Sequence, residues 1–262
     1  MKSNNRILAM SAAIMAAMAS VASATTTYTQ GDLLLGFRAT TGTGATTNYV
    51  VNLGQSTLYT SAVGTSTINV GNIGADLSNI YGSTWYTSVG TDVAWGVVGS
   101  ASNLVTVGAD AAATVYYTLP GAATTLNNTT QKIASGAMVT FESNTNGYST
   151  TFNSASLNSA FAQVIDASNA NSWSANLNNG TTTTIDFKLF PEIEGSPSTV
   201  LNLYRDGSTT GTGNQSVQLG SFSLSPTGAL TFTSVNPVPE PSAALLGGLG
   251  TLLLFTRRRR NA

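Results

Sequence analysis

Two glutamates, Glu192 and Glu194, are the pair whose type and spacing best suit catalysis. In an extended chain their Cα atoms would lie about 6.6 Å apart on one face. Two carboxylates that flank a glycosidic bond are sufficient for a glycosidase. Pro191, Gly195 and Pro197 surround the pair, however, and predict a solvated loop. We therefore expect no catalytic residues, and a hydrolase ranks last among the functions considered.

The chain contains no His and no Cys. This excludes imidazole acid–base catalysis, His metal sites, thiol chemistry and disulfides. No Gly-rich phosphate loop followed by Lys occurs. Asp110 and Asp206 are candidate Ca²⁺ ligands in an extracellular setting, but neither lies in an acidic loop of the density that Ca²⁺ sites need. We expect no metal and no cofactor.

Flat aromatic side chains are the other residues that could bind a ligand, because they stack on sugar rings. The candidates are Trp85, Tyr86, Trp95 and Trp173. In a protein without disulfides, large aromatics also fill the core. Trp95 lies within an apolar run and is expected in the core, whereas Tyr86 and Trp173 are expected to be exposed. These two are the candidate glycan contacts.

The C-terminal segment has the composition of a sorting signal rather than of a folded core. An apolar run over residues 242–256 is followed by an arginine block that consists of Arg257, Arg258, Arg259 and Arg260. The 15 residues of this run would span about 22 Å as a helix, less than the roughly 30 Å of a bilayer core. The arginines should remain on the cytoplasmic side. This pattern predicts a temporary membrane stop, and a permanent C-terminal anchor is the alternative.

Val238, Pro239, Glu240 and Pro241 precede that run, and the prolines favour an extended, accessible motif. Motif, apolar run and arginine block together resemble a PEP-CTERM sorting signal. The resemblance implies recognition by an exosortase, an integral-membrane cysteine transpeptidase-like enzyme of Gram-negative bacteria. Such systems commonly accompany exopolysaccharide and biofilm loci. The resemblance carries no information about the chemistry of the preceding domain.

The N-terminal segment has the pattern of a secretory signal peptide. Lys2 and Arg6 precede an apolar stretch over residues 7–21, and Ala22 and Ala24 occupy the small positions of a small-x-small cleavage site. We expect signal peptidase to cut after Ala24. An uncleaved N-terminal anchor helix is the alternative.

Between the two signals the chain carries little charge. Residues 25–238 hold four basic and ten acidic side chains, a formal net charge of −6. The absence of a basic patch excludes nucleic acid as a partner. Solubility must therefore come from Ser, Thr, Asn and Gly, and stability from core packing and backbone hydrogen bonds.

Short runs of Thr, Val, Tyr and Phe, interrupted by Gly, Asn and Ser, predict a mainly-β fold. The alternation of apolar residues changes phase at Gly220, which predicts a bulge, and Pro226, Thr227 and Gly228 predict a turn. We expect a β-sandwich-like domain, with its most buried strand at residues 93–98. The expected strands cover residues 31–37, 49–53, 93–98, 114–119, 137–142, 182–190, 201–204, 216–224 and 229–235.

One or two short helices are expected beside these strands. Leu157, Phe161 and Ile165 recur at helical spacing, which predicts an amphipathic helix over residues 154–167. A shorter helix is expected over residues 76–81.

Together these features predict an exported protein that is transiently associated with the inner membrane. Its predicted destination is the cell surface or extracellular matrix, and its predicted role there is structural or adhesive, without catalysis. The alternative is a carbohydrate-binding module associated with exopolysaccharide. Signal peptidase and an exosortase-type enzyme are the expected partners. The predicted domains are a signal peptide (1–24), a mature β-rich domain (25–236) and the sorting signal with its hydrophobic transmembrane helix (237–262).

Overall fold

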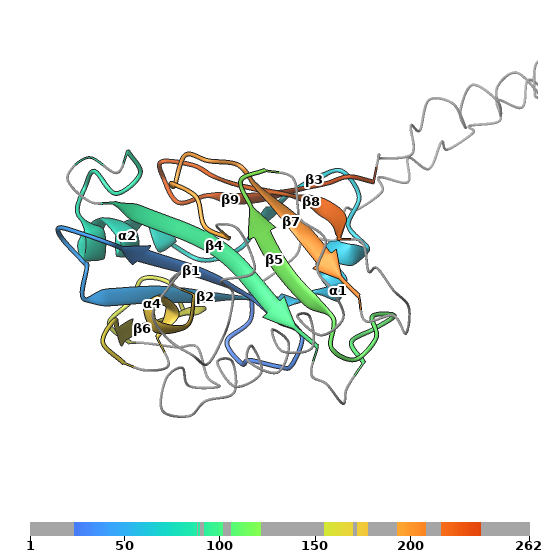
Figure 1. Cartoon of the computed structure of the whole chain (residues 1–262). Coiled ribbons are helices and arrows are strands. Elements are labelled where there is room, and N and C mark those ends of the chain that lie inside the picture. The colour runs from blue at the N-terminus through green and yellow to red at the C-terminus, as the bar shows by residue number, and fades with distance from the viewer. Residues whose placement is uncertain are drawn as a thin grey trace, which may run out of the picture.

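The computed structural model describes residues 24–87, 89, 92–101, 106–121, 155–169, 172–177, 193–207 and 216–236 (Figure 1). Ala22, the sorting motif, the arginine block and the strands expected over residues 137–142 and 182–190 lie outside these ranges. None of the helices within the described ranges has the length and apolar character needed to cross a membrane.

Nine strands and three short helices form within the described ranges, which confirms a mainly-β fold. The strands are β1 Asp32–Ala39, β2 Thr47–Gln55, β3 Thr65–Ile68, β4 Val93–Ser100, β5 Val115–Leu119, β6 Ala162–Asp166, β7 Leu201–Asp206, β8 Val217–Leu224 and β9 Leu230–Ser234. The helices are α1 Thr57–Thr60, α2 Ile73–Tyr81 and α4 Trp173–Leu177.

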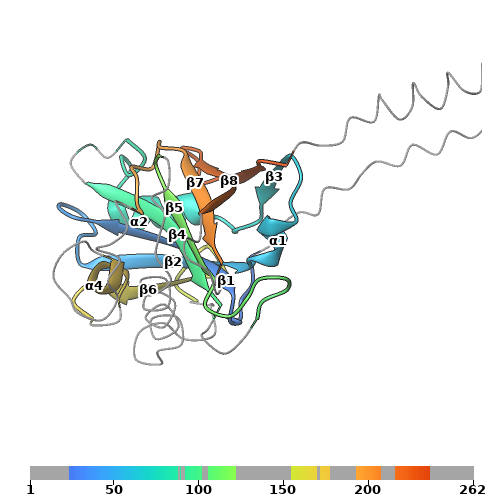
Figure 2. The same cartoon turned by 45° about the vertical axis from the view of Figure 1, so that its right-hand side comes forward.

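The strands form one antiparallel sheet, in the order β3-β9-β8-β7-β5-β4-β1-β2-β6. The sheet curls into an open half-barrel, as Figures 1 and 2 show from two sides. The sheet has two halves, one with β3, β9, β8, β7 and β5 and the other with β4, β1, β2 and β6. A sandwich has two separate sheets, whereas here the two halves remain one sheet. The reason is local: residues 98–100 of β4 pair with β5 and join the halves.

The hydrophobic core fills the concave side of this sheet and draws on both halves. α1 connects them, because the Tyr59 hydroxyl donates to the carbonyl of Leu53 in β2 at 3.0 Å. The Tyr59 ring packs against Phe222 and Phe232 of the opposite half, with centroids 5.4 and 5.1 Å apart. Curling therefore allows one core to serve all nine strands.

The strand predictions that fall within the described ranges are largely confirmed. β4 lies between β5 and β1 and is mostly buried on both faces, as expected. The register of β7 on β8 shifts at Leu219, beside the predicted bulge at Gly220. A Cβ on Gly220 would lie 2.4 Å from the Phe232 ring. Gly228 has a φ of 83° in the turn before β9, a conformation that favours glycine.

The helix predicted over residues 154–167 is wrong. Residues 162–166 form β6, which pairs with β2. Only Ala162 and Ile165 of this strand are buried, and this irregular pattern mimics helical spacing. The exposed edge of β2 decides the outcome, because its backbone groups gain partners from β6. The helix predicted over residues 76–81 is confirmed as α2, which begins at Ile73.

Candidate functional site

Glu194, the catalytic candidate that lies within the described ranges, is held in an ion pair. Arg38 on β1 donates from Nη2 to Glu194 Oε2 at 2.6 Å and from Nε to Oε1 at 2.9 Å. The indole N–H of Trp173 donates to Oε1 at 2.8 Å. The Arg38 and Glu194 side chains are only 12% and 9% exposed. The expected solvated loop is therefore wrong at Glu194, which holds residues 193–196 and α4 against β1.

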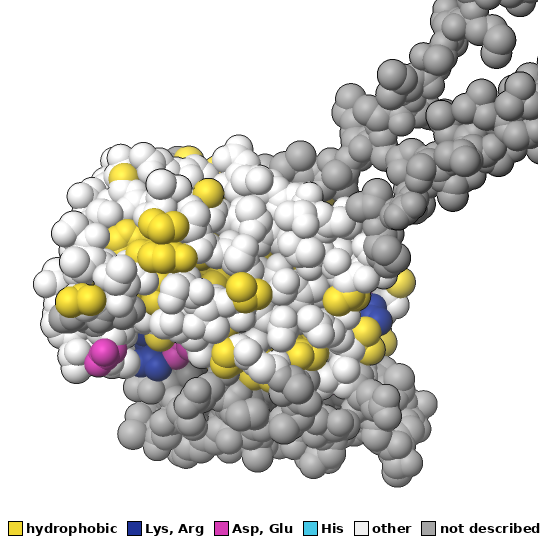
Figure 3. Space-filling view, turned by 90° about the horizontal axis from the view of Figure 1, so that it is seen from above, with side chains coloured by type: hydrophobic (Ala, Val, Ile, Leu, Met, Phe, Trp, Pro, Cys, Tyr) yellow, Lys and Arg dark blue, Asp and Glu magenta, His cyan; other side chains and the backbone are white. Residues whose placement is uncertain are grey.

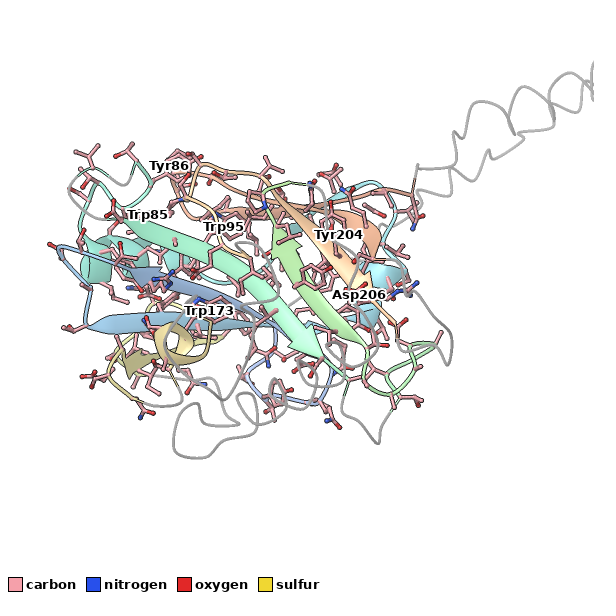
Figure 4. All side chains as sticks on the ribbon, in the orientation of Figure 1. Trp85, Tyr86, Trp95, Trp173, Tyr204 and Asp206 are labelled. Atoms are coloured by element: carbon pink, nitrogen blue, oxygen red, sulfur yellow. The ribbon has the colours of Figure 1, made fainter. Side chains whose placement is uncertain are left out.

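Trp173 is buried rather than exposed, which corrects the expectation for this residue. A Cβ on Gly36 would lie 2.2 Å from the Trp173 ring, so the ring packs closely on the backbone of β1. Figure 4 shows Trp173, the first residue of α4, well away from Tyr86, which lies at the upper end of the molecule. Tyr86 is half-buried, and its hydroxyl donates to the carbonyl of Leu224 at 3.1 Å. The two candidate glycan contacts thus do not form one platform.

The two candidate Ca²⁺ ligands belong to separate hydrogen-bond networks. Asp110 accepts from Arg205 Nη1 at 2.7 Å and from the Tyr116 hydroxyl. Asp206 accepts from the Tyr117 hydroxyl at 2.9 Å, and burial raises the pKa of its carboxyl. In the part of the chain that the structure describes, no three acidic side chains come together as a metal site.

Asp76 in α2 is a buried carboxylate that the sequence analysis did not single out. It accepts from the Tyr49 hydroxyl at 2.8 Å, from Asn158 N and Nδ2 at 2.7 and 2.8 Å, and from Ser159 N at 3.0 Å. These bonds connect α2, β2 and the turns before β6. With its oxygens engaged in this way, Asp76 organises the fold.

A surface of hydroxyl side chains lies on the outer face of β3, β9 and β8. Strand alternation turns Ile68, Leu230, Phe232 and Phe222 into the core, and the residues between them point outward. We call this surface the hydroxyl face. It consists of Thr65 and Thr67 of β3, Thr231 and Thr233 of β9, and Ser221 and Ser223 of β8.

The hydroxyl face is ordered in two rows across the strands. Ser221 is opposite Thr233, which is opposite Thr65; Ser223, Thr231 and Thr67 form the second row. Directly opposite side chains lie about 5 Å apart at their Cβ atoms. The Oγ1 atoms of Thr65 and Thr233 are 3.0 Å apart and share a hydrogen bond. The rows thus present donors and acceptors at regular intervals.

No charged residue occurs in β3, β8 or β9. Figure 3 looks down on the side of the molecule that carries these strands in Figure 1. The described surface there is mostly uncharged, with apolar patches among the polar side chains and charged side chains only near its margins. This surface therefore offers hydrogen bonds and apolar contacts rather than ion pairs.

An open groove continues the hydroxyl face at one end of β3. Its volume is about 460 Å³, and much of its lining comes from the end of β3 and the turn before β9. The lining residues are Thr67, Ile68, Asn69, Val70, Gly71, Thr227, Gly228 and Ala229. Like the hydroxyl face, this groove has no charged lining residue.

Sequence reasoning missed this surface for one reason. The alternation in residues 217–235 already implied outward Ser and Thr side chains, but β3 was not predicted as a strand. Without β3 the two rows lose Thr65 and Thr67.

No family model, curated protein or solved structure matches the chain. The residue patterns at the two ends of the chain and the described surface are the features that bear on function.

Proposed function

We propose that this chain is an exported, non-catalytic protein of the cell surface or extracellular matrix, with an adhesive or structural role. The observation that carries the adhesive role is the uncharged hydroxyl face with its two rows of Ser and Thr. Hydroxyl groups both donate and accept hydrogen bonds. They therefore suit polyhydroxylated polymers such as exopolysaccharide.

The proposed destination follows from the two ends of the sequence. The pattern around Ala22 and Ala24 supports export through signal peptidase. The PEP-CTERM-like motif at residues 238–241 supports sorting by an exosortase-type membrane enzyme, with Arg257–Arg260 as the cytoplasmic stop. The folded strands end at Ser234, so the motif follows closely after the domain.

The non-catalytic role is supported by the use that the fold makes of its carboxylates. Glu194 is committed to Arg38 and Trp173, and Asp76 to Tyr49, Asn158 and Ser159. A glycosidase instead needs two carboxyl groups that face each other across the scissile bond. The described acids are engaged within the fold.

Binding by the hydroxyl face should be weak for one domain and stronger for many. A hydrogen bond exchanged with water contributes only about 0.5–1.5 kcal/mol net. Many copies on one surface, meeting a repetitive polymer, raise the overall avidity without new contacts. Dense display on a cell surface or in a matrix suits such a binding mode. Carbohydrate binding, the alternative function, would thus use hydroxyl groups rather than the Tyr86 and Trp173 rings.

The test is retention of the purified chain on the host's own exopolysaccharide. Replacing Thr65, Thr67 and Thr233 together by Val removes three hydroxyls while it keeps the shape and strand propensity of each residue. We expect retention to fall about a hundredfold, since each of the three lost bonds contributes on the order of 1 kcal/mol and about 1.4 kcal/mol corresponds to a factor of ten. Thr87→Val, at an exposed turn elsewhere, is the matched control and should bind like the wild type.

Three outcomes would contradict the proposal. Unchanged retention of the triple variant would exclude the hydroxyl face as the adhesive surface. Glycan turnover that disappears in Glu194→Gln would make the protein an enzyme. An intact mass that still includes Arg257–Arg260 in the surface form would favour a permanent anchor over sorting and cleavage.

A further inference from the structure

Asp32, at the start of β1, is a buried carboxylate whose hydrogen-bond donors among the described residues are neutral. Its exposed fraction is 1%. Asn52 Nδ2 and the backbone N–H of Thr29 donate to Oδ2 at 2.9 and 2.8 Å, and Gln55 Nε2 donates to Oδ1. Neither ion pair between described side chains includes Asp32. Burying a charge without an opposite charge is costly, and desolvation raises the pKa of this carboxyl.

The first residues of the predicted mature chain lie beside this carboxylate. The backbone N–H of Thr25 donates to the Asn52 carbonyl at 3.2 Å. The Asn52 side chain, which holds Asp32, also donates to the Thr27 carbonyl at 3.2 Å. The Thr25 side chain itself interacts with the Asp32 carboxylate. Asn52 thus contacts both groups: its backbone carbonyl accepts from the nitrogen of Thr25, and its side-chain amide donates to the carboxylate of Asp32.

We propose that Asp32, Asn52 and Gln55 form a binding site for the α-amino group of Thr25, which exists only after the chain is cut behind Ala24. This inference rests on the proposed export. Signal peptidase hydrolyses the Ala24–Thr25 peptide bond with one water molecule. The new carboxylate leaves on Ala24, and the amine that remains on Thr25 takes up a proton. The resulting ammonium places a positive charge beside Asp32.

Processing exchanges one kind of contact for another. Ala24 is 4% exposed within the core, and its N–H donates to the Asn69 carbonyl at 3.3 Å. These contacts leave with the signal peptide. In return, an ammonium with three N–H donors replaces the single N–H of Thr25. Hydrogen bonds between charged groups are about twice as strong as neutral ones, so charge then holds the new N-terminus in place.

A double-mutant cycle tests the site. Two forms of the chain, both continuing to Ala262 and purified in mild detergent, begin either at Thr25 or at a tag that precedes Ser23 and Ala24. Each is made with Asp32 and with Asp32→Asn, and the unfolding equilibrium constant is measured in urea. The cycle cancels the loss of the Ala24 contacts, which affects both members of a pair equally. We expect Asp32→Asn to raise the constant about tenfold more in the Thr25 form. Equal effects in the two forms would overturn the proposal.

A second measurement covers the case in which Asp32→Asn does not fold. The α-amino group of the folded Thr25 form should react with an acylating reagent at least about tenfold more slowly than that of the urea-unfolded chain, because the ammonium is held against Asp32. The tagged form should show no such protection. Equal acylation rates for the folded and unfolded Thr25 forms would overturn the proposal.

The N-terminus of the exported protein separates this inference from the proposed function. A mass that begins at Thr25 supports both. A mass that begins at another residue near the cleavage site overturns the α-amino site and leaves export intact. Retention of the entire signal segment in the surface form contradicts the predicted cleavage itself.

Discussion

Each carboxylate in the described ranges accepts at least one hydrogen bond from within the fold. The seven are Asp32, Asp76, Asp92, Asp110, Asp166, Glu194 and Asp206. In a domain with so few charges and no disulfides, several of these bonds connect segments that are far apart in sequence. The Arg38–Glu194 pair joins residues separated by 156 positions. At the residue scale, most of the described acidic side chains organise the fold.

Glu194→Gln tests this use of a carboxylate. The substitution leaves the Arg38 guanidinium buried beside a neutral amide, so we expect a loss of roughly 2–4 kcal/mol in the free energy of unfolding. Urea denaturation would measure it. Adding Arg38→Met should cost much less than its effect alone, because the unpaired charge is then removed. Strict additivity of the two changes would show that the pair contributes no coupling.

The tryptophans give a second prediction at this scale. Trp85, Trp95 and Trp173 are at most 2% exposed. The native protein should therefore emit at short wavelength and resist quenching by acrylamide until it unfolds. Exopolysaccharide at saturating concentration should leave the emission unchanged, because the hydroxyl face contains no indole. A spectral shift on binding would instead indicate that a Trp side chain contacts the glycan.

At the element scale, the sheet has its shortest strand pairing where its two halves meet, between β4 and β5. Only residues 98–100 of β4 pair with β5, and the two strands diverge beyond them (Figure 1). Residues 193–196 fill the resulting gap, with Trp95 and Gly195 exchanging backbone hydrogen bonds at 2.9 Å. The Thr118 hydroxyl completes the junction, since it accepts from Val97 N at 2.8 Å and donates to the Ile193 carbonyl at 2.9 Å.

Thr118→Val should therefore destabilise the fold far more than the loss of a single hydroxyl group suggests. It leaves a buried N–H and a buried carbonyl without this hydroxyl, at a cost of about 1–3 kcal/mol for each group. Thr233→Val on the hydroxyl face is the same substitution at an exposed strand position and should change stability by less than about 0.5 kcal/mol. Urea midpoints of the two variants measure the difference. Equal midpoints would mean that the junction does not depend on Thr118.

At the scale of the whole molecule, one core built on a curled sheet must supply the stability. Tyrosines are prominent in it, and burial raises the pKa of five of them far above the usual value. These are Tyr49, Tyr59, Tyr81, Tyr116 and Tyr117. Because desolvation favours the neutral phenol, these rings remain protonated in the folded state at pH values where an unfolded chain would ionise.

This predicts the direction of alkaline unfolding. Below about pH 10 both the folded and the unfolded state hold their phenolic protons, so these tyrosines contribute no pH dependence to the stability. Above it the unfolded state releases protons that the folded state retains, and stability falls as pH rises. Phenolate absorbance from these five rings and loss of the β-sheet circular dichroism signal should therefore appear together. Phenolate formation by these five rings in a protein that keeps its native spectrum would refute their burial.

Local signals in the sequence determined much of this protein. The alternation of Leu and Phe with Ser and Thr predicted the β8–β9 hairpin, because the apolar face of such a strand must be buried. The lack of His and Cys excluded whole classes of chemistry without any structure. The apolar run over residues 93–98 predicted β4 at the centre of the sheet.

Contacts between distant segments decided the rest. Helical spacing predicted a helix over residues 154–167, but residues 162–166 form β6 because the edge of β2 offers backbone hydrogen-bond partners. The local sequence pattern does not reveal these partners. Trp173, at the start of α4, became buried because Gly36 on β1 leaves room for its ring. The hydroxyl face is complete only because β3 pairs with β9, where Thr65 lies opposite Thr233. Strand pairing and ring packing over such separations depend on the whole chain, and no local window of sequence contains them.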